Sequence, residues 1–282
     1  FRSDADHVSG APAIEDAGGR RLMLVILDSL TPENAANMPA MQSMMDSGLS
    51  STVEPCLDRL TKMCIDEALT GRQYFSLFGL LRNLGPLESG PGPNLLRDAR
   101  AAGRSVAMVT AGDLSAYDTD VDAQEIFKGG YSGAEMNTLM GFAAEHDLVV
   151  YHYRWHDSTS HRSRVGSRRY KRSVRRMNRA ITAIQRRLPK DMDLMVIGDH
   201  GHTKDGRHLQ GLDVPTVMAV KSPRLVGLQL EDKVPLTAVR FVSGAIMGLH
   251  SPDSRWDAAW SSWLSAEVSK ETVASVQSKQ AV

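Results

Sequence analysis

The chain has 282 residues, of which 42% are hydrophobic and 23% are charged, and its 33 basic side chains balance 33 acidic ones. This composition is ordinary for a globular protein, and the formal net charge of +0 excludes an overall electrostatic attraction to nucleic acid. No apolar run approaches the roughly 20 residues that a membrane-spanning helix needs, and no signal-peptide pattern stands at the start.

The first half of the chain alternates between apolar runs and helical patterns. Residues 1–20 are polar and predict a flexible leader. The continuous apolar run at 22–27 predicts a strand buried on both faces, which ends at Asp28. Residues 82–94, rich in proline and glycine, and the acidic residues 111–132 are predicted to be irregular. Further strands are predicted at 51–53, 105–110 and 147–153, and helices at 39–46, 61–69, 95–102 and 134–145.

The second half continues this alternation. Residues 162–187 carry eleven Arg or Lys and a row of apolar residues at steps of three and four, which predicts a basic amphipathic helix. Two interpretations of its charge are open: a surface for an anionic lipid or substrate, or a solvated face paired with acidic residues elsewhere. Strands are also predicted at 193–198 and 214–220, helices at 236–247 and 256–264, and a frayed tail at 269–282.

Strands that alternate with helices along the chain indicate parallel pairing, with helices on both faces of one sheet. The predicted fold is therefore a three-layer α/β/α sandwich with a mostly parallel central sheet. Residues 21–268 are expected to form it as a single domain, and no internal repeat or low-complexity block interrupts them.

Three of the predicted strands lead into carboxylates, and histidines follow two of them. The segment 193–208 reads DLMVIGDHGHTKDGRH, a buried strand that runs directly into acidic and imidazole side chains. Because the carboxyl ends of parallel strands meet at one edge of a sheet, these groups can converge. Three Asp and three His suffice for two ions with three protein ligands each; they suit zinc, and manganese fits similar ligands. The alternative for the last segment is a polar turn with surface histidines. The six residues are Asp28, Asp157, His161, Asp199, His200 and His208.

Thr61 follows a proline-containing loop at the predicted start of a helix. A helix N-terminus favours anions and a metal-bound hydroxyl loses its proton more readily, so Thr61 is a candidate nucleophile. The plainer interpretation is a helix N-cap, a position where threonine is common. Cys56 and Cys64 lie on either side of it and leave two alternatives open, a bridge across a turn or two buried free thiols.

Together these motifs resemble the alkaline phosphatase superfamily, and within it the type I phosphodiesterases. That group includes the nucleotide pyrophosphatase/phosphodiesterases and the glycosylphosphatidylinositol ethanolamine-phosphate transferases. The resemblance covers about residues 20–222 and implies an alkaline phosphatase-like catalytic domain. In the family a nucleophilic threonine lies nine residues before a Thr-Gly pair, as Thr61 lies before Thr70. Four segments carry the resemblance in the family's order: LMLVILDS, LTKMCIDEALTG, HDSTSH and GDHGHTKDGRH.

The resemblance also implies two divalent ions, with zinc favoured, and assigns the ligands between them. The family's Asp-x-x-Gly-His motif corresponds to Asp157 and His161, and its Asp-His-Gly motif to Asp199 and His200. The ligands implied for one ion are Asp157, His161 and His208, and those for the other are Asp28, Asp199, His200 and the hydroxyl oxygen of Thr61.

Several positions depart from the family's pattern without removing a ligand. Ser160 replaces the glycine before the second-segment histidine, His202 stands where methionine is frequent, and residues 209–211 replace a glycine-rich turn. Asn83 lies about one residue from the position of an asparagine that touches phosphate in the nucleotide phosphodiesterases. His202 and His156 have two interpretations, as second-layer partners in proton transfer or as residues that orient nearby loops.

The reaction implied by the resemblance is a two-step displacement. The Thr61 alkoxide attacks phosphorus, and the covalent intermediate passes to water in a hydrolase or to an acceptor hydroxyl in a transferase. The short interval from Asp199 to His208 resembles the transferase branch. That branch implies a phosphodiester or phospholipid-type substrate with a phosphoethanolamine-like head group, and an extracytoplasmic location with an anchor outside this chain.

Other hypotheses remain beside this one. A nucleotide-type phosphodiesterase and a phosphomonoesterase would use the same scaffold, and a non-catalytic binding domain would keep only the fold. An anionic membrane surface is the partner suggested for the basic helix at 162–187. Nucleic acid is not expected as a partner, because the basic residues lack interleaved aromatic side chains.

Overall fold

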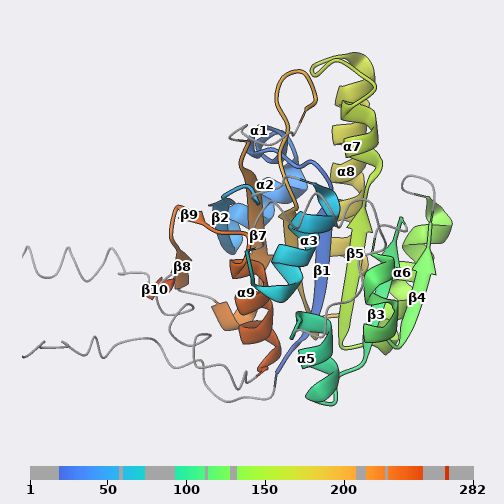
Figure 1. The fold of residues 1–282 in the computed structure, drawn as a ribbon, viewed down its shortest axis with the longest axis vertical. Coiled ribbons are helices and arrows are strands. Elements are labelled where there is room, and N and C mark those ends of the chain that lie inside the picture. Colours follow the sequence, from blue (N-terminus) through green and yellow to red (C-terminus); the bar gives the residue numbers. More distant parts are fainter. Residues whose placement is uncertain are drawn as a thin grey trace, which may run out of the picture.

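The computed structural model describes residues 19–56, 60–73, 93–111, 114–127, 132–207, 214–225, 228–249 and 264–266. A sheet of eight strands crosses the centre of this part of the chain, and helices pack on both of its faces (Figure 1). This arrangement confirms the predicted three-layer α/β/α sandwich.

Strand β1 lies at the centre of the sheet, between β5 and β6, in the order β4-β3-β5-β1-β6-β7-β2-β9. Neighbouring strands pair in parallel except at β7, which runs antiparallel to both β6 and β2. A separate pair, β8 (Leu228–Leu230) and β10 (Leu264–Ala266), is antiparallel. The bounds of the eight strands are β1 Arg21–Leu27, β2 Leu49–Val53, β3 Val106–Thr110, β4 Ala123–Ile126, β5 Leu148–Tyr153, β6 Met192–Gly198, β7 Thr216–Lys221 and β9 Lys233–Val234.

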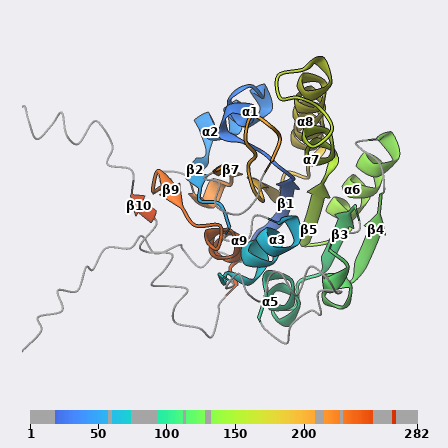
Figure 2. The same ribbon diagram turned by 45° about the horizontal axis from the view of Figure 1, so that its top comes forward.

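The helices form two layers, with α3, α5 and α9 on one face and α1, α2, α6 and α8 on the other (Figure 2). Alternate strand residues supply the two cores: Leu24 and Ile26 of β1 pack toward α3, whereas Val25 and Leu27 pack toward α2 and α8. The side-chain period of two in a strand thus decides which layer each residue meets. The helix bounds are α1 Pro32–Ala36, α2 Pro39–Ser47, α3 Thr61–Thr70, α5 Leu95–Ala101, α6 Gly133–Glu145, α7 Trp155–Ser160, α8 Arg168–Arg187 and α9 Ala238–Met247.

Two expectations from the sequence are corrected. Within 111–132, predicted to be irregular, the chain forms a 3-10 helix at Ser115–Asp120 and the edge strand β4. The residues of β4 are only partly buried or exposed, so no apolar pattern announced it. The helix predicted at 256–264 lies outside the described residues except for its last one, Leu264, which begins β10 instead.

The predicted leader up to residue 18, the tail from 269 and most of the loop at 82–94 lie outside the described residues. The basic helix begins later than residue 162, since Ser167 caps it by accepting a hydrogen bond from the Tyr170 N–H. None of the helices described is both long and apolar enough to cross a membrane.

Candidate active site

The candidate site lies at the carboxyl edge of the three central strands. Asp28 follows β1 and Asp199 follows β6, and the register pairs Leu27 with Gly198, so the two carboxylates leave the sheet side by side. Both continue the strand parity that points toward α3. Gly198 has no room for a side chain, because a Cβ there would collide with Thr216 Oγ1.

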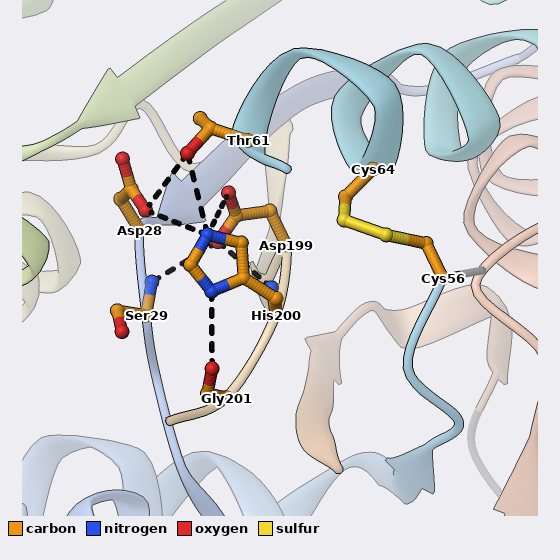
Figure 3. Close-up of a disulfide and its surroundings, with 8 residues drawn as sticks. All are labelled: Asp28, Ser29, Cys56, Thr61, Cys64, Asp199, His200 and Gly201. Carbon is orange, nitrogen blue, oxygen red and sulfur yellow. Dashed lines mark hydrogen bonds and ion pairs between the residues drawn. A yellow bond between two sulfur atoms is a disulfide. The ribbon is translucent and has the colours of Figure 1, made fainter. Parts of the chain in front are cut away.

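Thr61 is the first residue of α3, and the start of this helix lies beside the ends of β1 and β6. The N-cap residue is Leu60, so the interpretation of Thr61 as an N-cap is wrong. Its Oγ1 instead lies 3.3 Å from His200 Nε2 and 3.5 Å from Asp28 Oδ1 (Figure 3). The threonine hydroxyl is therefore directed at the acidic cluster.

The side chains of this cluster could hold one divalent ion; they are Asp28, Thr61, Asp199 and His200. His200 Nε2 lies 3.3 Å from Asp28 Oδ1 and 3.4 Å from Asp199 Oδ2. These separations are longer than good hydrogen bonds, and they match the edge of a tetrahedron of N and O ligands around zinc, about 3.3 Å for bonds of about 2.0 Å. Asp199 Oδ2 is also buried and accepts no hydrogen bond from the described residues. Distances and the orphaned oxygen together favour a cation among these side chains.

A further histidine, His152 of β5, was missed from the sequence. It is buried, and its Nε2 lies 3.4 Å from Asp28 Oδ2. One ligand atom each from Asp28, His152 and Asp199 lie within 4.8 Å of one another. The alternation of side chains along a strand could have identified it. His152 is two residues after Val150, which packs toward α3, so His152 faces the same side of the sheet as Asp28.

The second predicted ligand group is only partly described. Asp157 lies in α7, and one of its carboxylate oxygens is within 4.8 Å of ligand atoms from Asp28 and His200. His161, at the end of α7, has its Nε2 3.3 Å from Asp157 Oδ1 and a side chain that is 46% exposed. His208 and Asn83 lie outside the described residues. The structure thus brings five of the seven predicted metal ligands together and places His161 beside them.

Burial and mutual charge set the protonation of the cluster. Burial favours neutral carboxyls; nevertheless the neighbouring imidazoles of His152 and His200 hold the pKa of Asp28 well below its usual range. Burial and the charge of Asp28 raise the pKa of Asp199 to about 7. Burial alone would lower the pKa of His200, but the charges of Asp199 and Asp28 raise it to about 10. Without a cation, the cluster therefore retains protons near neutral pH.

Metal binding to this cluster is expected to strengthen as the pH rises. A divalent ion must displace the protons on His200 and Asp199. Both groups have a pKa raised by folding, so the folded metal-free chain binds extra protons and its free energy of unfolding falls as pH rises through about 7 and then about 10. Zinc should accordingly raise the unfolding temperature more at about pH 8 than at about pH 6. Calorimetry at both pH values checks this, and equal shifts would contradict it.

Next to the cluster, a buried polar network connects Asp199 to helix α8. Ser29 has a left-handed φ of 69°, and its N–H donates to Asp199 Oδ1 at 3.0 Å. The Ser29 hydroxyl lies 2.9 Å from His202 Nδ1, and His202 Nε2 lies 2.8 Å from the Tyr170 hydroxyl. The strained backbone at Ser29 is thus fixed from two sides.

The same network contains the second histidine that the sequence singled out. Asn34 donates to the Tyr170 hydroxyl at 2.6 Å and lies 3.1 Å from His156 Nε2. Burial and the neighbouring His202 lower the pKa of His156 to about 3, so it is neutral. Tyr170 and Asn34 were not identified from the sequence, where Tyr170 falls in the predicted basic helix and Asn34 in a segment with no predicted element.

Both ends of α3 are held in place. Cys56 and Cys64 form a disulfide, with Cα atoms 5.3 Å apart, that joins the segment before the helix to its first turn (Figure 3). At the other end Gly71, at φ 65°, ends the helix, and the buried Arg240 guanidinium donates to the Thr70 carbonyl. The position of Thr61 is therefore set by a covalent bond and a buried cation at a helix C-terminus.

Comparisons with known proteins agree with this architecture. No protein-family model matches the chain, and no curated protein matches its sequence. Solved structures do match it. Murine ectonucleotide pyrophosphatase/phosphodiesterase 5, as an inactive Thr-to-Ala variant in complex with AMP, is 11% identical, with a TM-score of 0.63 over 87% of this chain and 100% of that chain.

Two bacterial structures are similar to the same degree. The periplasmic domain of phosphoethanolamine transferase EptC from Campylobacter jejuni is 12% identical, with a TM-score of 0.62 over 86% of this chain and 94% of that one. An alkaline phosphatase superfamily protein from Vibrio parahaemolyticus is 12% identical, with a TM-score of 0.61 over 85% and 69% of the respective chains. The chain therefore has the fold of the alkaline phosphatase superfamily, as its four sequence segments predicted.

Proposed function

We propose that this protein is a metal-dependent phosphotransferase or hydrolase that cleaves a phosphodiester through a covalent intermediate on Thr61. The observation that carries the proposal is the position of the Thr61 hydroxyl, at the start of a helix and 3.3 Å from His200 Nε2 within an Asp-His cluster. A hydroxyl in that position has anionic and imidazole groups on one side and a helix N-terminus on the other.

The geometry supports a two-step displacement. The Thr61 hydroxyl loses its proton and its Oγ1 attacks phosphorus. The bond from phosphorus to the leaving oxygen breaks, that oxygen takes up a proton, and the substituted phosphoryl group is held on threonine. Water or an acceptor hydroxyl then attacks phosphorus and releases Thr61. When bound, divalent ions would supply the positive charge that favours an ionised hydroxyl and neutralises phosphoryl oxygens. Asp28, Asp157, Asp199, His200 and Thr61 are the described residues that would hold them, together with His161 and His208.

We favour transfer of a phosphoethanolamine-like head group to an acceptor hydroxyl. The short interval from Asp199 to His208 supports this branch, and so does the similarity in fold to a phosphoethanolamine transferase domain. The alternative is a nucleotide-type phosphodiesterase, which the similarity in fold to an AMP-binding phosphodiesterase supports. The two alternatives share the chemistry at Thr61 and differ in the group that accepts the phosphoryl.

We also propose an extracytoplasmic location. The Cys56–Cys64 disulfide supports it, because such bonds persist in oxidising compartments and are rare in the reducing cytosol. The structurally similar transferase domain is periplasmic.

Turnover assays on three substrates test the proposed function. The zinc-loaded chain is expected to cleave bis-p-nitrophenyl phosphate, a diester, or to release the head group of phosphatidylethanolamine, and to lose that activity when the metal is chelated and regain it when zinc is restored. A preference for p-nitrophenyl phosphate would instead indicate a phosphomonoesterase. Folded, metal-loaded protein that turns over none of the three would contradict the proposal and favour a binding domain.

A further inference from the structure

Helices α7 and α8 pack against each other (Figure 1). A polar cavity outside the candidate active site is lined by residues of both helices. Its volume is about 320 Å³. Trp155 and Thr159, four residues apart on one side of α7, line it, whereas Asp157 projects from the same helix toward the active-site cluster. The rest of the lining comes from the first half of α8: Arg168, Arg169, Arg172, Ser173 and Arg176.

The charge at this cavity is not compensated by protein groups. Residues 158–190 contain no Asp or Glu, and none of the carboxylates described pairs with any of the four arginines. Arg168, Arg172 and Arg176 repeat at intervals of four, which places like charges next to one another on one helix face. Arg168 lies in the first turn of α8, at the positive end of the helix dipole, and that turn has no acidic residue. Each of these arrangements favours a bound anion.

The cavity differs from the remainder of the same helix. Arg175 and Arg179 do not line it and represent the solvated face of the helix; most of the lining arginines are exposed too, so the difference lies in position and not in exposure. Arg176 is partly buried, and its guanidinium lies 5.3 Å from the centre of the Trp155 ring. This cation–π contact joins two residues that line the cavity. The Thr159 and Ser173 hydroxyls donate to backbone carbonyls, which leaves the guanidinium groups as the principal donors toward a ligand.

We propose that this cavity binds a phosphate-bearing ligand. One guanidinium group can donate two parallel hydrogen bonds to two oxygens of a phosphate. A phosphate monoester has three such oxygens and about two negative charges, so it suits several guanidinium groups better than a single carboxylate does. The volume is that of a small-molecule site. The ligand is either a soluble phosphorylated compound or the head group of an anionic lipid. The site is separate from the proposed reaction, since none of its lining residues belongs to the Asp-His cluster.

Two paired variants of α8 test the proposal. Arg168→Gln with Arg172→Gln removes two charges from the cavity lining, and Arg175→Gln with Arg179→Gln removes two charges at the same spacing from the solvated face. Inorganic pyrophosphate is titrated calorimetrically into the full chain freed of divalent ions, so that no ion can retain pyrophosphate at the Asp-His cluster. The cavity pair should weaken binding by about tenfold or more, and the control pair by less than about twofold.

Vesicles distinguish the two sources of phosphate. Sedimentation with phosphatidylcholine vesicles that contain about 20% phosphatidic acid reports on a lipid head group. Loss of pyrophosphate binding in the cavity pair assigns a soluble ligand, whereas loss of vesicle binding alone assigns a lipid. Equal weakening by both pairs, or an unmodified chain that binds neither probe, would overturn the proposal. Arg172→Lys serves as a second variant that keeps the charge and the fold, and it should weaken binding severalfold because it loses the two-pronged contact.

Discussion

Replacement of Thr61 with alanine is expected to reduce phosphodiester turnover by at least about a thousandfold, because it removes the nucleophile of the first step of the proposed reaction. The loss should appear in kcat, since the cluster that would bind the substrate stays in place. Stability should change little, because Thr61 does not cap α3 and its hydroxyl contacts only Asp28 and His200 among the described residues. Steady-state kinetics on the diester and a thermal unfolding curve check both expectations.

Two further variants of α3 make this result specific. Thr61→Ser keeps a hydroxyl at the same atom and should retain measurable turnover. Thr70→Ala makes the same chemical change at the other end of the helix, where the hydroxyl donates to the Asp66 carbonyl, and should be active. Residual turnover in Thr61→Ala equal to that of Thr61→Ser would show that another group, such as water, attacks phosphorus directly.

Replacement of His152 with leucine is expected to lower zinc affinity by about 10- to 100-fold. The imidazole lies 3.4 Å from Asp28 Oδ2 and contributes to the low pKa of that carboxyl, so its loss weakens the anionic ligand at the centre of the cluster. Leucine suits the position sterically, because the neighbouring residues on that face of β5 are Leu148 and Val150. Competition with a zinc-chelating dye measures the affinity.

A histidine elsewhere in the chain provides the control for this variant. His146 lies at the end of α6 and contacts the Phe142 carbonyl rather than the cluster. His146→Leu should leave zinc affinity unchanged. If His152→Leu also bound zinc with unchanged affinity, His152 would be a packing residue and the cluster would be complete without it.

The sequence predicted the sheet because its central strands are continuous apolar runs with acidic ends. The run at 22–27 is typical of a strand covered on both faces, and Asp28 directly after it was expected at the carboxyl end of that strand. The same logic predicted the positions of Asp199 and His200. These predictions succeeded because local pattern and tertiary position coincide at the end of a buried parallel strand.

Features that depend on contacts distant in sequence were not predictable in this way. His152 lies inside a strand, where nothing in the local sequence separates a ligand from a buried polar residue. The contact between His202 and Tyr170 joins residues 32 positions apart, and only the docking of α8 on the sheet creates it. Edge strand β4 was missed because it buries too little surface for an apolar pattern.

The alternation of side chains along β5 has a consequence for how this protein can change in evolution. His152 reaches the cluster because it shares a face with Leu148 and Val150, and β5 is bonded on both sides, to β1 and β3. Deletion of one residue within β5 would turn His152 toward the opposite helical layer without any substitution. Insertions and deletions among related chains are therefore expected to gather in loops, and β1, β5 and β6 to keep a constant length even where their residues differ.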